Sequence, residues 1–225
     1  MIVKEFTIED LTMKYNVGIN QIAFNFNDVL KSNRLKNEQD GLSYLFNLID
    51  TIQTKFKGST VQFIKTKYVL NLEHLFLACY FVQKAFNRKI NISNTKNIEL
   101  FLYLSAKRQI KSGIDAFGIT EEDLKSSILT YCIISSLNDV NQINKEIMHH
   151  VIGSEIEVNL EQFDAEKCEE IKNFFEITDH QIDIILKSHG ITKDQEKKKP
   201  ANQVIAMQDL ICEKMSLLSL EKTKF

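Results

Sequence analysis

The sequence of 225 residues has no tryptophan, one proline and only seven glycines. The glycines stand far apart, so neither the dinucleotide-binding pattern Gly-x-Gly-x-x-Gly nor a glycine-rich phosphate loop is possible. No serine lies in a Gly-x-Ser-x-Gly context. The adjacent His149 and His150 would point about 100° apart on a helix, which does not suit a shared metal ion. The sequence therefore predicts no catalytic residue, no metal ligand and no cofactor.

Cysteine and long apolar runs are also scarce. The four cysteines are scattered, which excludes local Cys-x-x-Cys spacing and is typical of a reducing, intracellular compartment. No apolar run approaches the roughly 18 residues of a membrane-spanning helix, and the first residues lack the pattern of a signal peptide. We expect a cytoplasmic protein, also nuclear if its source is eukaryotic, that does not bind membranes.

Charge is distributed unevenly along the chain, although the whole carries a net charge of only −2. Residues 55–111 contain eleven basic residues and two acidic ones, a net charge of +9. Two of the three arginines, Arg88 and Arg108, lie in this segment, and their planar guanidinium groups suit phosphate oxygens. A concentrated basic face attracts polyanions whatever the remote acids do. The alternative interpretation is an ordinary solvated, lysine-rich surface.

The hydrophobic patterning predicts a mixed α/β fold. β-Branched and aromatic residues predict strands at residues 17–26, 60–64 and 126–134, and the polar residues 32–41 predict a loop. Apolar residues at helical spacing predict helices at residues 41–54, 70–86, 97–106, 109–117, 138–151, 164–175 and 178–188. Thr178 or Asp179 is the expected N-cap of the last of these helices.

One boundary is predicted near the carboxyl end. Residues 190–200 hold a charge run and the only proline, and they indicate a flexible linker between residues 1–189 and 201–225. Residues 201–220 follow as an amphipathic helix. A segment of about 20 residues cannot bury a core by itself, so we expect this helix to dock on the same domain or on a partner.

Four sequence motifs carry a family resemblance: LEHLFLA before a basic turn, LYLS-x-x-RQI, AFGI, and EKMSLL near the end. Together they resemble the kinase-binding subunit of the KEOPS (EKC) complex, which makes the threonylcarbamoyl modification of tRNA adenosine. The resemblance covers residues 60–188 and the final helix, and the first 55 residues match more weakly. It implies a single domain in which helices flank an antiparallel sheet.

The resemblance also implies a function without catalysis. In the family this subunit grips the amino-terminal lobe of a small atypical kinase/ATPase subunit, meets the other KEOPS subunits indirectly, and in archaeal members captures the single-stranded 3′ CCA end of tRNA. The sequence departs from the archaeal pattern at Ala106 and Lys107, and residues 155–200 are longer and more acidic than expected. Two alternatives therefore stay open: a scaffold-only subunit that binds the kinase without contacting RNA, and an unrelated soluble α/β protein.

For tRNA, we expect six residues at two helix ends to line one groove: Lys84, Arg88, Lys89, Lys107, Arg108 and Gln109. The cations would contact phosphates, and Gln109 or the ring of Tyr103 would read or stack a terminal base. The competing interpretations are core packing for Tyr103 and a helix cap or surface amide for Gln109.

For the kinase, the helix at residues 201–220 carries more apolar residues than one docking face requires. Val204, Met207, Ile211, Met215 and Leu218 share one face, which suits the body of the protein. Other apolar residues, Leu210 and Leu217 among them, fall off that face and favour a partner. We expect the kinase interface to combine Leu210 and Leu217 with Ile114 and Phe117. The alternative is a helix that is buried on two sides within the monomer.

Overall fold

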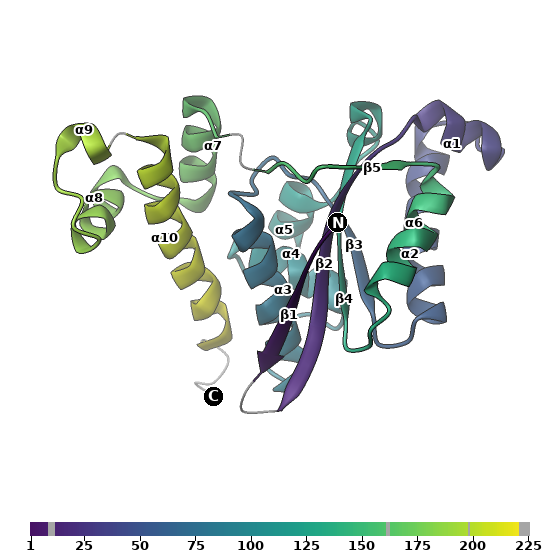
Figure 1. Ribbon diagram of the computed structural model, residues 1–225, viewed down its shortest axis with the longest axis horizontal. Helices are drawn as coiled ribbons and strands as arrows, with labels where there is room; N and C mark the ends of the chain where they lie inside the picture. The colour runs from purple at the N-terminus through teal and green to yellow at the C-terminus, as the bar shows by residue number, and fades with distance from the viewer. Residues whose placement is uncertain (9–11, 161–162, 198, 221–225) are drawn as a thin grey trace. The chain divides into compact units, whose positions relative to one another are not determined.

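The computed structural model describes residues 1–8, 12–160, 163–197 and 199–220 (Figure 1). It confirms a mixed α/β fold with an antiparallel sheet. Contacts between Cα atoms divide the chain into two compact units. We call Met1–Lys65 with Gly118–Asn159 the sheet unit, and Thr66–Phe117 with Leu160–Phe225 the helical unit. The predicted linker at residues 190–200 falls inside the helical unit, and the predicted domain division stays a prediction.

The sheet unit holds all described strands: β1 (Ile2–Ile8), β2 (Met13–Ala23), β3 (Thr60–Ile64), β4 (Ile128–Ser135) and β5 (Ser154–Ile156). Four of them pair in the order β1-β2-β4-β3, and β5 pairs with the end of β2. Strand β3 has the predicted bounds, whereas β2 begins and ends earlier than the predicted strand. Strands β1 and β5 were not predicted from the sequence.

Three α-helices belong to the same unit: α1 (Phe26–Ser32), α2 (Glu38–Lys55) and α6 (Val140–Val151). Helix α2 packs on β3, and α6 packs on β2, on β4 and on α2, so both cover one face of the sheet (Figure 1). The buried core lies between these helices and the sheet. The predicted loop at residues 32–41 is too long, because the Asn37 side chain accepts a hydrogen bond from the amide of Asp40 and starts α2 at Glu38.

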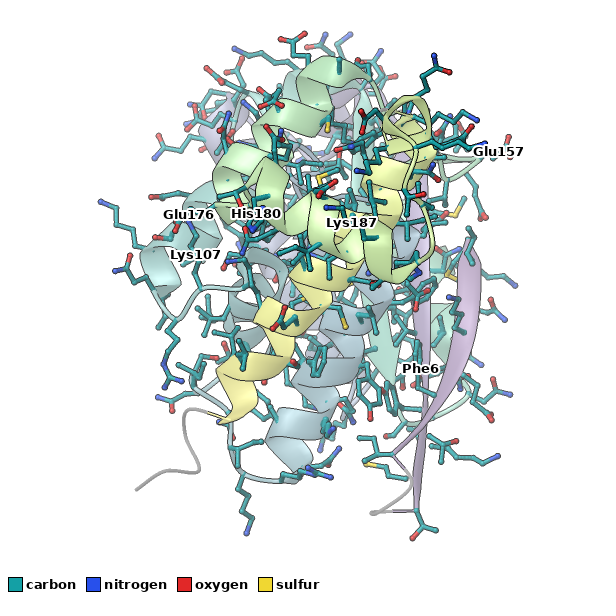
Figure 2. All side chains as sticks on the ribbon, turned by 90° about the vertical axis from the view of Figure 1, so that its left-hand side faces the viewer. Phe6, Lys107, Glu157, Glu176, His180 and Lys187 are labelled. Atoms are coloured by element: carbon teal, nitrogen blue, oxygen red, sulfur yellow. The ribbon has the colours of Figure 1, made fainter. Side chains whose placement is uncertain are left out.

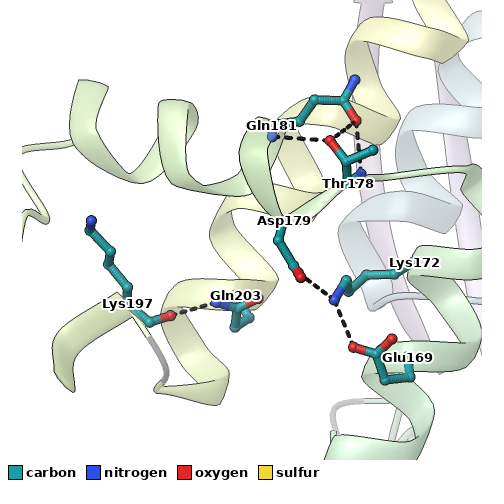
Figure 3. A network of polar contacts seen from close by, with 7 residues as sticks. All are labelled: Glu169, Lys172, Thr178, Asp179, Gln181, Lys197 and Gln203. Atoms are coloured by element: carbon teal, nitrogen blue, oxygen red, sulfur yellow. Dashed lines mark hydrogen bonds and ion pairs between the residues drawn. The ribbon is translucent and has the colours of Figure 1, made fainter. Parts of the chain in front are cut away.

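The helical unit contains no strand among its described residues. Its helices are α3 (Leu72–Asn87), α4 (Lys96–Ser105), α5 (Ile110–Phe117), α7 (Ala165–Phe175), α8 (Asp179–Ser188), α9 (Asp194–Lys197) and α10 (Pro200–Leu220). Thr178, one of the two predicted candidates, is the N-cap of α8. It forms a reciprocal capping box with Gln181 (Figure 3).

Helix α10 packs against α3, α4, α7 and α8 of the same unit. Met207, Ile211, Met215 and Leu218 are buried, as their spacing predicted, whereas Val204, the fifth residue of the predicted docking face, is only partly buried. The segment before α10 contains α9, and Gln203 of α10 donates a hydrogen bond to the main-chain oxygen of Lys197 (Figure 3). Between α7 and α8, the Lys172 ammonium bridges Glu169 and Asp179, at 2.6 Å from each carboxylate (Figure 3).

Among the residues described, no helix has both the length and the apolar character needed to cross a bilayer.

Candidate nucleic-acid interface

A cavity of about 540 Å³ opens in the helical unit where α4 ends and α5 begins. The end of α7 and the last turns of α10 form its other side. Its lining combines cationic, polar and apolar side chains: Ser105, Ala106, Lys107, Arg108, Gln109, Ser112, Phe175, Glu176, Lys214, Leu217 and Leu218. The site therefore draws residues from three separate stretches of the sequence.

The turn between α4 and α5 directs the basic residues into this cavity. Ala106 ends α4 with φ +49°, in the left-handed region, where its amide donates to the oxygen of Tyr103. The amide of Lys107 donates to the oxygen of Leu102, which completes the reversal. The chain then enters α5 with Lys107, Arg108 and Gln109 at its amino-terminal end.

Gly113 fixes the position of α5 on α4. A Cβ atom at this position would lie 2.9 Å from the main-chain oxygen of Phe101, a distance that real Cβ atoms do not adopt. Glycine thus allows the two helices to cross closely, and the close crossing holds Arg108, Gln109 and Ser112 at the cavity.

Two of the cations have protein partners. The Lys107 ammonium lies 3.3 Å from the carboxylate of Glu176 and 4.8 Å from the centre of the Phe174 ring. Lys107 and Glu176 lie next to each other in Figure 2. Nη1 of Arg108 donates to the main-chain oxygen of Leu218, 3.3 Å away, which ties the turn to the end of α10.

The lining carries three cations, Lys107, Arg108 and Lys214, against the single carboxylate of Glu176. Half-exposed Leu217 and the buried Phe175 and Leu218 supply apolar surface. A positive cavity with apolar surface can hold a phosphate group and pack against the face of a base. No charged cluster suited to a metal ion, with three or more His, Cys, Asp or Glu, occurs among the described residues.

The expectation that six residues line one groove is wrong. Helices α3 and α4 run antiparallel: Nε2 of His74, at the start of α3, lies 3.1 Å from the oxygen of Leu104, at the end of α4. At the opposite end, the Lys96 ammonium donates to Oε1 of Gln83. Lys84, Arg88 and Lys89 come ten to fifteen residues after His74, so they lie about 15–20 Å from the end of α4 that carries Lys107. The structure brings Lys107, Arg108 and Gln109 together and places the other three at the far end of α4.

Tyr103 cannot stack a base, because its side chain is fully buried and its ring stacks on Phe81 with 5.5 Å between the ring centres. Gln109 is exposed at the mouth of the cavity, and its Oε1 accepts a hydrogen bond from the hydroxyl of Ser112. Lys214 and Glu176 were missed by the sequence analysis. The chain gives no local signal for Lys214, but Glu176 stands at a helix end where glycine is usual.

The residues predicted for the kinase divide into two groups. Phe117 is fully buried and Leu210 is 6% exposed, so the prediction that they form a surface is wrong. Both fill the core of the helical unit, since α5 turns Phe117 inward and α10 is buried over a wide arc. Ile114 and Leu217 are 39% and 45% exposed. Ile110, one turn before Ile114 on α5, is equally exposed and was not predicted.

A family model described as kinase binding protein CGI-121 matches residues 26–219 of the chain. The protein therefore belongs to the CGI-121 family of kinase-binding proteins. This confirms the resemblance to the KEOPS kinase-binding subunit that the sequence motifs carry. No curated protein matches the chain.

Proposed function

We propose that this chain is a non-catalytic subunit of the KEOPS complex that binds the small kinase/ATPase subunit and recruits tRNA by its 3′ CCA end. In this role it serves the threonylcarbamoyl modification of tRNA, contacts the other KEOPS subunits indirectly, and acts in the cytoplasm, and also in the nucleus of a eukaryotic source. Membership of the kinase-binding family supports the first part. The cationic cavity at the start of α5 supports the second.

A single-stranded tRNA end suits this cavity chemically. Its phosphates are accessible to Lys107, Arg108 and Lys214, and its bases are unstacked and can be read on their edges. The amide of Gln109 supplies both donors and an acceptor for a base edge or a 2′-hydroxyl. Arg88 and Lys89, about 20 Å away, would contact phosphates further along the same strand.

The first test is binding of intact tRNA by an Arg88→Glu/Arg108→Glu double variant. Reversing two phosphate-binding charges is expected to weaken binding by about 10- to 100-fold and to lower the salt slope by about 0.7 for each phosphate that is no longer neutralised. Lys145→Glu, an exposed charge reversal on α6, is the matched control and should bind nearly as wild type. Electrophoretic titration measures both, with thermal unfolding to verify that each variant folds.

The same titration with tRNA that lacks its CCA end tests where the RNA binds. Wild-type protein should bind this RNA at least tenfold more weakly than intact tRNA, since the group proposed to enter the cavity is missing. Equal affinity for the two RNAs contradicts the assignment of the cavity to the 3′ end. Unchanged affinity of the double variant contradicts the role of the two arginines.

One observation favours the scaffold-only alternative: Lys107 and Arg108 both have protein partners in the structure, Glu176 and the oxygen of Leu218. Under that function both interactions are structural. The protein would then co-purify with the kinase subunit and bind neither form of tRNA.

The kinase surface is proposed to include the outer face of α5, with Ile114, and Leu217 of α10. Burial of such exposed apolar residues is the usual basis of a protein interface. Ile114→Glu and Leu217→Glu are each expected to abolish co-purification with the kinase subunit and to leave the thermal transition nearly unchanged. Phe46→Glu, at an equally exposed apolar residue of α2, is the control and should still co-purify. Retention of the kinase by both test variants places the interface elsewhere.

A further inference from the structure

Glu176 is an unusual residue for its position. It follows the last residue of α7 with φ +54°, in the left-handed region that favours glycine. A carboxylate at this end of a helix also faces the negative end of the helix dipole. Ala106 and Ile152 end their helices in the same conformation, so what distinguishes Glu176 is its charged side chain. That side chain is 76% exposed and forms an ion pair with Lys107 at the cavity.

Lys107 is held from a second side, which does not depend on Glu176. Its ammonium lies 4.8 Å from the centre of the Phe174 ring. That ring is fixed in turn, because it stacks on Tyr68 at 4.3 Å and meets Phe117 edge-on at 5.8 Å. The ammonium can therefore exchange one anionic partner for another while the ring keeps it in place.

We propose that Glu176 acts as an internal competitor for the RNA-binding cavity: its carboxylate occupies Lys107 in the free protein and is displaced by a phosphate group when RNA binds. This inference rests on the proposed function of the cavity. No covalent step is involved, since one ion pair is exchanged for another. Glu176 thus lowers the affinity of the cavity for polyanions in general and makes binding depend on the additional interactions that a fitting RNA end supplies.

The exchange is feasible because the existing ion pair is weak. Exposed pairs stabilise a protein only slightly, and the energy to break this one corresponds to about a two- to fivefold reduction in RNA affinity. Salt weakens the pair and the phosphate interaction together, so the reduction is expected to be largest at low ionic strength.

Glu176→Gln tests the proposal, with intact tRNA as the probe and its dissociation constant as the readout. The variant is expected to bind about two- to fivefold more tightly than wild type at low salt, with the difference shrinking as salt is added. Glu170→Gln is the matched control. It removes the same charge from the same helix, at a side chain 40% exposed and paired with Lys67 at 3.0 Å, outside the cavity. Its affinity should equal that of wild type.

A double-mutant cycle identifies Lys107 as the shared partner. In a Lys107→Gln background, Glu176→Gln should add no affinity, because the proposed competition no longer exists. An equal gain from Glu170→Gln, no gain from Glu176→Gln, or a full gain in the Lys107→Gln background each overturns the proposal.

The outcomes also separate this inference from the function on which it rests. If wild type binds intact tRNA and Glu176→Gln binds it equally well, the competition is absent and the RNA-binding function stands. If wild type and all the variants fail to bind tRNA, the RNA-binding function falls and the competition with it.

Discussion

Replacing Glu99 with alanine is expected to lower the free energy of unfolding by about 2–5 kcal/mol. The side chain is fully buried in the first turn of α4, and its two carboxylate oxygens accept hydrogen bonds from the amides of Ile92 and Ser93 at 2.7–3.0 Å. Alanine leaves the buried amide of Ser93 and the partly buried amide of Ile92 without this acceptor. A buried amide left unpaired costs about 1–3 kcal/mol, and the partly exposed one costs less than a fully buried one. Urea unfolding measures the change.

Glu166→Ala is the matched control, since Glu166 is an exposed glutamate in the first turn of α7. The free energy of unfolding of this variant should stay within about 0.5 kcal/mol of the wild-type value. Glu99→Gln keeps one acceptor oxygen and should fall between the two alanine variants. Similar losses at positions 99 and 166 contradict the account. Glu99 anchors the turn at Ile92 and Ser93, which follows Arg88 and Lys89 in the chain. Glu99→Ala should therefore also disturb the positions of these two basic residues.

Acidification from about pH 6.5 to about pH 4 is expected to remove roughly 3 kcal/mol of stability through His74 alone. Burial of this side chain, which has no exposed surface, lowers its pKa from 6.5 to about 4. Its Nδ1 accepts from the amide of Leu70, and Nε2 faces the oxygen of Leu104. Below pH 6.5 His74 binds a proton in the unfolded chain but not in the folded protein. Stability therefore falls as pH falls, and it levels off below the folded pKa.

The measurement is urea unfolding at several pH values in wild type and in His74→Gln. The variant is less stable at pH 7, but it should lose about 3 kcal/mol less than wild type between pH 6.5 and pH 4. His180→Gln, at an exposed histidine of α8, is the control for the substitution itself and should change the free energy of unfolding at pH 7 by no more than about 0.5 kcal/mol. Parallel pH profiles in wild type and His74→Gln contradict the role assigned to His74.

Local patterns in the sequence predicted much of the secondary structure. Strand β3 has the predicted bounds, and the spacing of Met207, Ile211, Met215 and Leu218 correctly identified the buried face of α10. Strand β1 was missed because most of its residues are exposed on both faces, so it lacks the alternation of a half-buried strand. Strand β5 has only three residues, too few for any periodicity.

The candidate site was only partly predictable, because its geometry depends on the direction in which helices run. The sequence marks the basic ends of α3 and α4, but only the antiparallel packing shows that these ends lie apart. Burial of Phe117 and Leu210 is likewise set by tertiary packing: apolar residues outside the main stripe of α10 find further neighbours within the helical unit. Glu176 and Lys214 reach the cavity from α7 and α10, which no local pattern connects to residues 105–112.

The two sides of the cavity come from stretches of chain that the sheet unit interrupts: residues 105–112 precede its second segment, and residues 175–218 follow it. No single continuous segment of the chain therefore contains all the residues that line the cavity. A synthetic peptide copying residues 105–112 would carry Lys107, Arg108 and Gln109, which are proposed to contact RNA, but neither Lys214 nor the apolar wall. Grafting this recognition onto another protein would require transplanting the interleaved scaffold as well.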